Sequence, residues 1–417
     1  YKNNAKIKFF HFYTLKKKFT NHSFFINKLI KIYKSFNVEK GITSYDFHFT
    51  KKDLNKFTKN FYQLEKKKSK LNKFKIDGIK IGDLIYDSYL FCTRNSTVNF
   101  EDPVLKDIFI EAHKIFYTCK KYFIKNHIEF LIPSHVCYIP YGIITRIALK
   151  KGTAVYKVKC ENWANAFFRL IKINKKSQID EQPFYEYRKI FKKFTFEEQK
   201  KGIKIGKRIL DQRISGTFDK NLPYMKVNQF KKENLKANQI KISNKPKIII
   251  FSHCFYDNPH RFRNLYFNDF YEQIKFILEL SKKLNNYEWF YKPHPNELDG
   301  NLDIHNYFKK TYPHINLLKK NTGHRRIIRM KPELVITNHG TIAHEYASFY
   351  IPVVNTGDNP HISYDFCLHA KNKISLKDIL INLNKYKKKI KFNKKNIYEF
   401  LFMHYEYFPN LYNKKKL

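Results

Sequence analysis

Residues 334–345 read LVITNHGTIAHE, a short apolar run that changes at once to polar residues and a glycine. Residues 288–296, EWFYKPHPN, repeat this arrangement with a lysine and a histidine between prolines. Such apolar runs predict buried strands, and ligands bind at the carboxyl ends of strands in open α/β sheets. The two stretches therefore predict an α/β fold in which the two strand ends together form a site for an anionic ligand.

The second half of the chain alternates strands and helices around these two stretches. Strands are predicted at 247–251, 288–291, 315–318, 334–337 and 353–355, and helices at 269–284, 325–330, 341–349, 375–386 and 396–405. This alternation is typical of a Rossmann-like parallel sheet.

The first half gives weaker signals. Helices are predicted at 24–33, 103–126, 141–148 and 184–212, strands at 128–132 and 154–156, and a loop and turn with two acids at 79–87. The polar stretch 231–247 is the expected linker. We therefore expect a basic helical segment at 1–72, an α/β domain at 73–240, and a second α/β domain at 246–417.

Composition limits the function classes. The chain has 417 residues, a net charge of +45 and 43% apolar residues, which is enough for a sizeable core. Lysine runs are spread along the whole sequence, a pattern more typical of an AT-rich genome than of a selected nucleic-acid-binding surface. Binding to an anionic membrane surface is still compatible with this charge. The longest aliphatic run, Ile248–Ile250, is too short to cross a bilayer. Six scattered cysteines without a Cys-x-x-Cys pair indicate reduced thiols and a cytoplasmic protein.

Histidines gather in the second half, where ten of the 17 lie between His253 and His369. Four of them, His253, His294, His339 and His361, flank predicted strand ends. Any single one could be an ordinary surface or core histidine, but four at strand ends favour a site. Their spacing does not match a zinc site, so no metal is expected.

Two short motifs supply anion-binding chemistry. Gly340 and Thr341 precede a predicted helix, whose first N–H groups carry about half a positive charge. Glu345 follows one turn later and could accept ribose hydroxyls, or could simply be solvated while Thr341 caps the helix. The prolines around His294 fix its backbone, so its ring could donate to a diphosphate or protonate a leaving group.

Together these residues resemble the bacterial capsule and surface-polysaccharide glycosyltransferases related to the capsular Kdo transferases. The resemblance rests on KPHP at 292–295, TNHGTxxHE at 337–345 and Ile351-Pro352-Val353. Supporting pieces are GDLIYDSY at 82–89, RISG at 213–216, FSHCFYD at 251–257 and NxGDNPH at 355–361. Tyr350 stands where the related enzymes usually have glycine, and the Gln-Glu-acid motif of the β-Kdo transferases is not present.

The resemblance implies a GT-B-like architecture, in which two Rossmann-like domains with parallel sheets face a cleft. It implies donor phosphate contacts by Lys292 and His294, and phosphate and ribose contacts by Gly340, Thr341 and Glu345. Further donor-site candidates within these motifs are His253, His339, His344, Asn359 and His361. The catalytic candidates are His294 and two first-domain carboxylates, Asp83 and Asp87, which could equally be turn or capping residues.

The sequence thus predicts a cytoplasmic glycosyltransferase, peripheral on the inner membrane face. It would need no cofactor beyond a nucleotide-sugar co-substrate, and its acceptor would be a surface polysaccharide or lipid-linked glycan. One alternative keeps the fold but transfers a polyol phosphate from a CDP donor. The other is a basic nucleic-acid-binding protein, which the absence of any known nucleic-acid motif disfavours.

Overall fold

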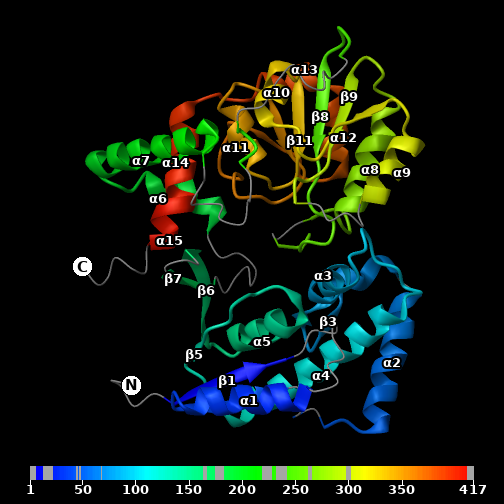
Figure 1. Ribbon diagram of the computed structural model, residues 1–417, viewed down its shortest axis with the longest axis vertical. Helices are drawn as coiled ribbons and strands as arrows, with labels where there is room; N and C mark the ends of the chain where they lie inside the picture. Colours follow the sequence, from blue (N-terminus) through cyan, green and yellow to red (C-terminus); the bar gives the residue numbers. More distant parts are fainter. Residues whose placement is uncertain are drawn as a thin grey trace. The chain divides into compact units, whose positions relative to one another are not determined.

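The computed structural model describes residues 6–12, 22–43, 46, 48–66, 68–162, 167–173, 183–217, 228–231, 242–261, 265–296 and 302–410. The chain forms two compact units, Tyr1–Lys157 and Val158–Leu417. The colours of Figure 1, which follow the residue numbers, identify the segments of each unit. The predicted domain division at 240–246 differs from this division, because the long helix α7 (Phe196–Ser215) packs against α14 (Lys394–Phe402) inside the second unit. The predicted linker, 231–247, lies largely outside the described residues.

The second unit is built on a six-stranded parallel sheet. The strands are β8 (Lys247–Phe251), β9 (Glu288–Lys292), β10 (Ile315–Leu317), β11 (Leu334–Thr337), β12 (Val353–Asn355) and β13 (Leu368–His369). Their order in the sheet is β10-β9-β8-β11-β12-β13, and every pairing is parallel. The predicted α/β class and parallel sheet are therefore confirmed, together with the five strands predicted in this half.

This strand order has a reversal at β8. The chain adds β9 and β10 on one side of β8 and then returns to add β11, β12 and β13 on the other. It is the Rossmann order, and the reversal leaves a crevice outside the carboxyl ends of β8 and β11, where ligands of such sheets bind. The topology thus selects one edge of the sheet as the candidate site.

Helices cover both faces of this sheet. Successive strand side chains point to opposite faces, so Ile249 packs into one hydrophobic core while Ile248 and Ile250 pack into the other. The helices that follow the strands are α8 (Phe270–Ser281), α9 (Leu302–Thr311), α10 (His324–Arg329), α11 (Ile342–Ala347), α12 (Lys373–Ile381) and α13 (Leu383–Lys387), and Figure 1 shows them around the sheet. The result is a three-layer α/β/α arrangement.

The predicted helix at 184–212 is divided into three pieces. They are η3 (Phe184–Glu186), α6 (Tyr187–Phe191) and α7, which starts at a capping box between Thr195 and Glu198. A Cβ on Gly206 would lie 1.9 Å from the carbonyl oxygen of Tyr398, so the glycine lets α7 and α14 approach closely. The chain ends with η5 (Met403–Tyr407) and α15 (Phe408–Asn410).

The first unit is mainly helical in its described residues. Its helices are α1 (His22–Lys34), α2 (Lys51–Glu65), η2 (Lys68–Lys73), α3 (Gly82–Thr93), α4 (Pro103–Lys125) and α5 (Tyr138–Lys150). Parallel pairing joins β1 (Ile7–His11) to β2 (Val38–Thr43) and β5 (Phe130–Leu131) to β6 (Ala154–Asn162). The short strands β3 (Lys75–Ile76) and β4 (Ile79–Lys80) pair antiparallel. Strand β7 (Phe167–Lys172) belongs to the second unit.

One prediction for the first unit was wrong. The stretch 79–87 was expected to be a loop and turn, but from Gly82 onward it is the first part of α3. Every residue from Gly82 to Leu90 is buried, so the helix has no polar face and shows no amphipathic period in the sequence. In the described part of the chain, no helix is both long enough and apolar enough to cross a lipid bilayer.

Candidate functional site

Three histidines meet at the carboxyl edge of the second unit's sheet. His253 follows β8, His294 follows β9 and His339 follows β11. The rings of His253 and His339 have centroids 4.2 Å apart, and those of His253 and His294 are 6.4 Å apart and nearly parallel. All three side chains are partly exposed. These three strand-end histidines therefore lie together at the point where the strand order reverses.

Hydrogen bonds fix which ring nitrogens carry protons. The backbone N–H of His339 donates to Nε2 of His253 at 3.4 Å, which places the proton of a neutral His253 on Nδ1. The backbone N–H of Asn296 donates to Nδ1 of His294 at 3.2 Å, which places the proton of a neutral His294 on Nε2. The loop after β9 thus orients the His294 ring through its own backbone.

Two of these imidazoles are uncharged near neutral pH. Burial, with help from the adjacent His294, lowers the pKa of His253 to about 3. Burial also holds the pKa of His339 well below its usual range, and His253, Arg261 and His294 add to that effect. The two rings therefore serve as neutral hydrogen-bonding groups, and Arg261 supplies a permanent positive charge close to them.

Gly340 packs directly behind the strand-end histidines. A Cβ at this position would lie 3.0 Å from Oγ1 of Thr337 and 3.5 Å from Cε1 of His253. The predicted helix after it is short, because α11 has only six residues, and Thr341 makes no side-chain capping bond to it. The alternative in which Thr341 simply caps this helix is therefore wrong, and a side chain at 340 would require Thr337 to shift by a few tenths of an ångström.

Lys292 lies at the end of β9 but points into the protein. Its side chain is 1% exposed, Nζ donates to the carbonyl oxygen of Lys320 at 3.0 Å, and the ammonium lies 5.9 Å from the centre of the Phe251 ring. The phosphate contact stays a prediction, because an ammonium carries three N–H donors and the Lys320 carbonyl accepts only one of them. In the observed arrangement, Lys292 ties β9 to the loop after β10.

Glu345 is buried in an ion pair and is not solvated. Its Oε1 accepts a hydrogen bond from Nε of Arg213 at 2.7 Å, and Oε2 lies 3.8 Å from Nε2 of His324. Burial alone would raise the pKa of Glu345, but Arg213 and the neighbouring histidines outweigh it and lower the pKa to about 2. His324 in turn contacts the hydroxyl of Tyr346 through Nδ1 at 3.0 Å. This network connects α7, α10 and α11 beneath the site.

The remaining donor-site candidates form a second buried group. Nδ1 of His344 lies 3.0 Å from Nε2 of His361, and both rings pack on Phe400 of α14. Oδ1 of Asn359 accepts the backbone N–H of His361 at 2.9 Å. The exposed fractions of His344, His361 and Asn359 are 2% or less. They support the loop after β12 from within and are not at the surface with the strand-end histidines.

The two first-unit carboxylates lie on α3. Asp83 is 1% exposed and accepts two hydrogen bonds from Arg146, at 2.7 and 2.9 Å. Arg146 also donates to the carbonyl oxygen of Lys80 at 2.7 Å, so the ion pair fastens α5 to the start of α3. Asp87 lies one turn later and is also 1% exposed. A carboxylate that accepts two hydrogen bonds from a guanidinium in this way is better suited to holding two helices together than to transferring a proton.

Sequence reasoning gave no role to three residues of the second unit that matter here. Arg213 was part of a quoted motif, but its ion pair with Glu345 joins residues 132 positions apart. His324 and Arg261 lie outside the motifs. Tertiary packing brings Arg213 and His324 to Glu345 and Arg261 close to His339, and no local sequence pattern marks them.

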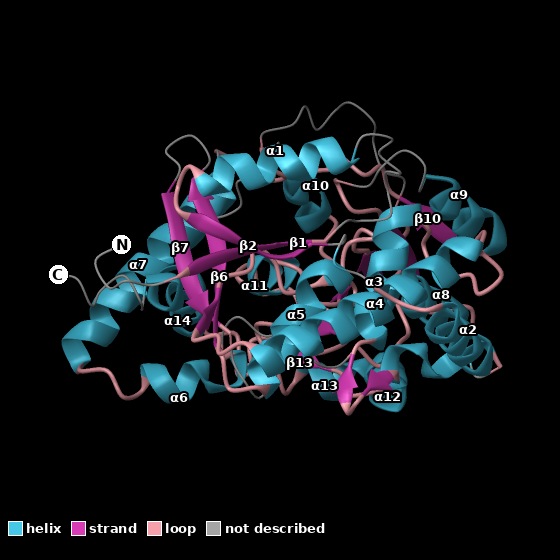
Figure 2. Cartoon of the chain, turned by 90° about the horizontal axis from the view of Figure 1, so that it is seen from below, coloured by secondary structure: helices cyan, strands magenta, loops and turns pink. Residues whose placement is uncertain are grey.

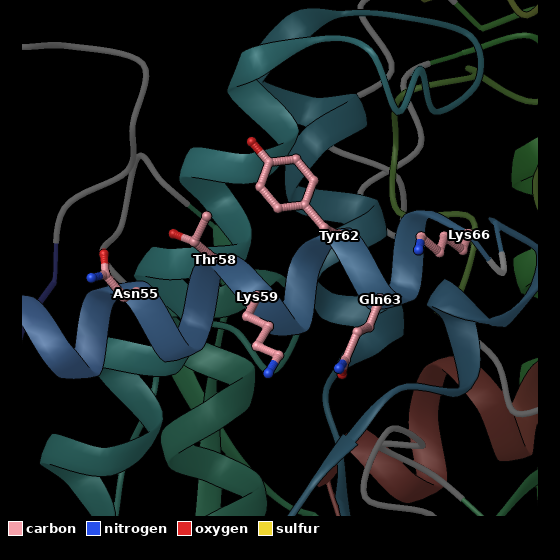
Figure 3. Close-up of a pocket in the computed structure, with 6 residues that line it drawn as sticks. All are labelled: Asn55, Thr58, Lys59, Tyr62, Gln63 and Lys66. Atoms are coloured by element: carbon pink, nitrogen blue, oxygen red, sulfur yellow. The ribbon is translucent and has the colours of Figure 1, made fainter.

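A separate open groove lies on the first unit, along α2 (Figure 3). It has a volume of about 480 Å³ and is lined by Asn55, Thr58, Lys59, Tyr62, Gln63 and Lys66. None of the predicted site residues lines it. Among the described residues, no three His, Cys, Asp or Glu side chains gather as a metal site would require.

Comparisons with known proteins add similarity of fold only. No protein-family model matches the sequence, and no curated protein matches it. The β-Kdo 2,4-transferase KpsC of Thermosulfurimonas dismutans aligns with 65% of this chain and 78% of its own, at 7% identity and a TM-score of 0.39. The UDP-GlcNAc 2-epimerase of Neisseria meningitidis, solved with UDP-GlcNAc, aligns with 94% of this chain and 96% of its own, at 10% identity and a TM-score of 0.28. A putative UDP-N-acetylglucosamine 2-epimerase of Listeria monocytogenes aligns with 93% of this chain and 91% of its own, at 11% identity and a TM-score of 0.30. At such low similarity, the reaction of this chain has to be inferred from its own residues.

Proposed function

We propose that this protein is a glycosyltransferase of GT-B type that binds a nucleotide-activated sugar at the carboxyl edge of its β8–β11 crevice. The observation that carries the proposal is the convergence of His253, His294 and His339 at the reversal of a Rossmann strand order. The acceptor in this proposal is a surface polysaccharide or a lipid-linked glycan.

The chemistry of the strand-end histidines suits a diphosphate. A neutral imidazole donates one hydrogen bond, and His294 carries its proton on Nε2 because Nδ1 accepts from Asn296. Arg261 adds positive charge beside His339. Glycosyl transfer from a nucleotide donor develops negative charge on the leaving phosphate, and fixed donors at that position lower the barrier.

The experiment is nucleotide binding by the full chain. Thermal shift and calorimetry with CMP, CDP, UDP and GDP should show binding of one of them, weakened tenfold or more (about 1.4 kcal/mol) in His294→Ala. His314→Ala is the matched control, because this exposed histidine directly precedes β10 and so lies at the opposite edge of the sheet. Gly340→Ala should also weaken binding, since its Cβ crowds Thr337 and His253.

Two results would redirect the proposal. Product analysis that finds a phosphodiester in place of a glycosidic bond would indicate a polyol-phosphate transferase of the same fold. Stabilisation by a short DNA duplex alone, abolished by salt, would show that the net charge of +45 and not the crevice binds the ligand.

A further inference from the structure

Helix α1 carries an apolar stripe that the described residues of the first unit leave partly exposed. Leu29, Ile32, Tyr33 and Phe36 follow the spacing i, i+3, i+4, i+7 and so share one side of the helix and its C-terminal turn. The exposed fractions of Ile32, Tyr33 and Phe36 are 46%, 39% and 62%. Single exposed apolar residues are ordinary, but three adjacent ones on one stripe mark an interaction surface.

The polar side of the same helix is rich in lysine. Lys28, Lys31 and Lys34 are all exposed, and no acidic residue occurs anywhere in His22–Lys34. A helix with an apolar stripe, a lysine-rich polar face and no acids is the pattern that lies in the interface of anionic lipid membranes. Long lysine side chains at such a helix reach the headgroups while the apolar residues enter the acyl boundary.

The first unit holds α1 in position for this contact. Chain order β1–α1–β2 with parallel pairing places the helix alongside the two strands, as Figure 2 shows. The Tyr33 ring stacks on Phe9 of β1 with centroids 4.6 Å apart. This stack anchors one edge of the stripe and leaves Ile32 and Phe36 largely accessible, so the helix can dock without unfolding.

We propose that α1 docks the protein onto an anionic lipid bilayer by inserting Ile32 and Phe36 between headgroups that its lysines contact. The inference does not depend on the proposed function, because it uses only first-unit residues. Charge complementarity selects this partner: α1 of a second copy would bring the same three lysines and no acid, which repels. Nucleic acid would use the lysines but leave the apolar stripe without a purpose.

The test is sedimentation of the full chain with vesicles of phosphatidylcholine alone or with about a third phosphatidylglycerol. We expect partitioning at least tenfold stronger with the anionic lipid. Ile32→Ser/Phe36→Ser should weaken partitioning at least tenfold, whereas Ile374→Ser/Ile381→Ser, which changes two exposed isoleucines of α12, should not. Thermal melting and nucleotide binding of each variant show whether it is folded.

A second set of variants isolates the charge. Lys28→Gln/Lys31→Gln/Lys34→Gln should weaken anionic-vesicle binding by about two orders of magnitude, because each lysine near an anionic surface contributes about fivefold. Lys200→Gln/Lys204→Gln/Lys207→Gln, which removes three exposed charges from α7, is the control with the same net change.

Three outcomes would overturn the proposal. The first is equal binding to neutral and anionic vesicles, or binding that neither α1 variant reduces. The second is a concentration-dependent dimer that Ile32→Ser/Phe36→Ser dissociates, which would make the stripe an interface between copies. The third is a DNA duplex that binds through the α1 lysines while the serine variant remains unchanged in both assays.

Discussion

Arg213 of α7 donates a hydrogen bond to Glu345 of α11 at 2.7 Å, with 5% and 0% of the two side chains exposed. This buried ion pair joins the long helix before the sheet to the helix that follows β11. It therefore couples the position of the strand-end crevice to the packing of α7.

Removing one partner of this ion pair should lower the stability of the folded protein strongly. Glu345→Gln leaves the buried Arg213 without its counter-ion, so the free energy of unfolding should fall by about 3–5 kcal/mol. Denaturant titration measures it. Glu333→Gln, in the partly exposed pair with Lys387, is the control and should cost no more than about 1 kcal/mol. Near-equal losses at both positions would contradict the role given to Arg213–Glu345, and Arg213→Met/Glu345→Leu should recover much of the loss.

His324 predicts acid sensitivity. Burial lowers its pKa to about 3 in the folded protein, with Glu345 only partly opposing the effect. In the unfolded chain His324 binds a proton with a pKa near 6.5, whereas in the folded chain it stays neutral down to about pH 3. The contribution of this residue to the free energy of unfolding is therefore fully present above pH 6.5 and is lost as the pH falls towards 3. The slope from this residue approaches about 1.4 kcal/mol per pH unit below pH 6. His324→Gln should lower the slope of the stability profile between pH 6 and 4 by up to about 1.4 kcal/mol per pH unit in denaturant titrations, while His253 and the other buried histidines keep their contributions. An unchanged slope would exclude this residue.

The glycine between α7 and α14 should not tolerate a methyl group. Gly206→Ala places a Cβ 1.9 Å from the backbone oxygen of Tyr398, so the two helices must separate. We expect a loss of at least about 3 kcal/mol in unfolding free energy, at the upper end of overpacking effects. Lys207→Ala, one residue along and exposed, should stay within about 0.5 kcal/mol. A stable Gly206→Ala protein would refute the close contact.

Tyr350 occupies a left-handed backbone conformation, with φ of 60°, after the end of α11. Glycine adopts this conformation without strain, whereas a residue with a Cβ does not. Tyr350→Gly should therefore be more stable than Tyr350→Ala by about 1 kcal/mol. At Phe349, where φ is not positive, the order should reverse and Phe349→Ala should be the more stable variant. Thermal melting of the four variants shows whether glycine is more stable than alanine at position 350 and less stable than alanine at position 349.

Asp83 should behave as a structural residue. Asp83→Asn breaks the bidentate pair with Arg146 and should lower the unfolding free energy by about 3 kcal/mol or more. Turnover per folded molecule, measured below the melting transition, should remain within a few fold of the parent. A loss of a hundredfold or more in a folded Asp83→Asn protein would instead assign it to proton transfer.

Local sequence was sufficient for five of the six strands of the sheet and for the strand ends that carry the histidines. Alternating apolar runs and polar strand ends predicted the five strands from β8 to β12, because buried parallel strands need continuous apolar residues whatever their neighbours are. The histidines after β8, β9 and β11 were found for the same reason. Helix α3 was missed, because burial on all sides removes the polar face by which a helix is recognised in sequence.

Tertiary structure decided what the individual polar residues do. Glu345 and Lys292 belong to ligand-binding motifs by sequence, yet one pairs with Arg213 and the other with the Lys320 carbonyl. The close contact of Gly206 with Tyr398 likewise joins segments far apart in the chain. The spacing of apolar residues along the chain is a local property, and it favours one type of secondary structure over another. The partner of a buried charge depends on which distant segments the fold brings within about 3 Å, and no local pattern encodes that.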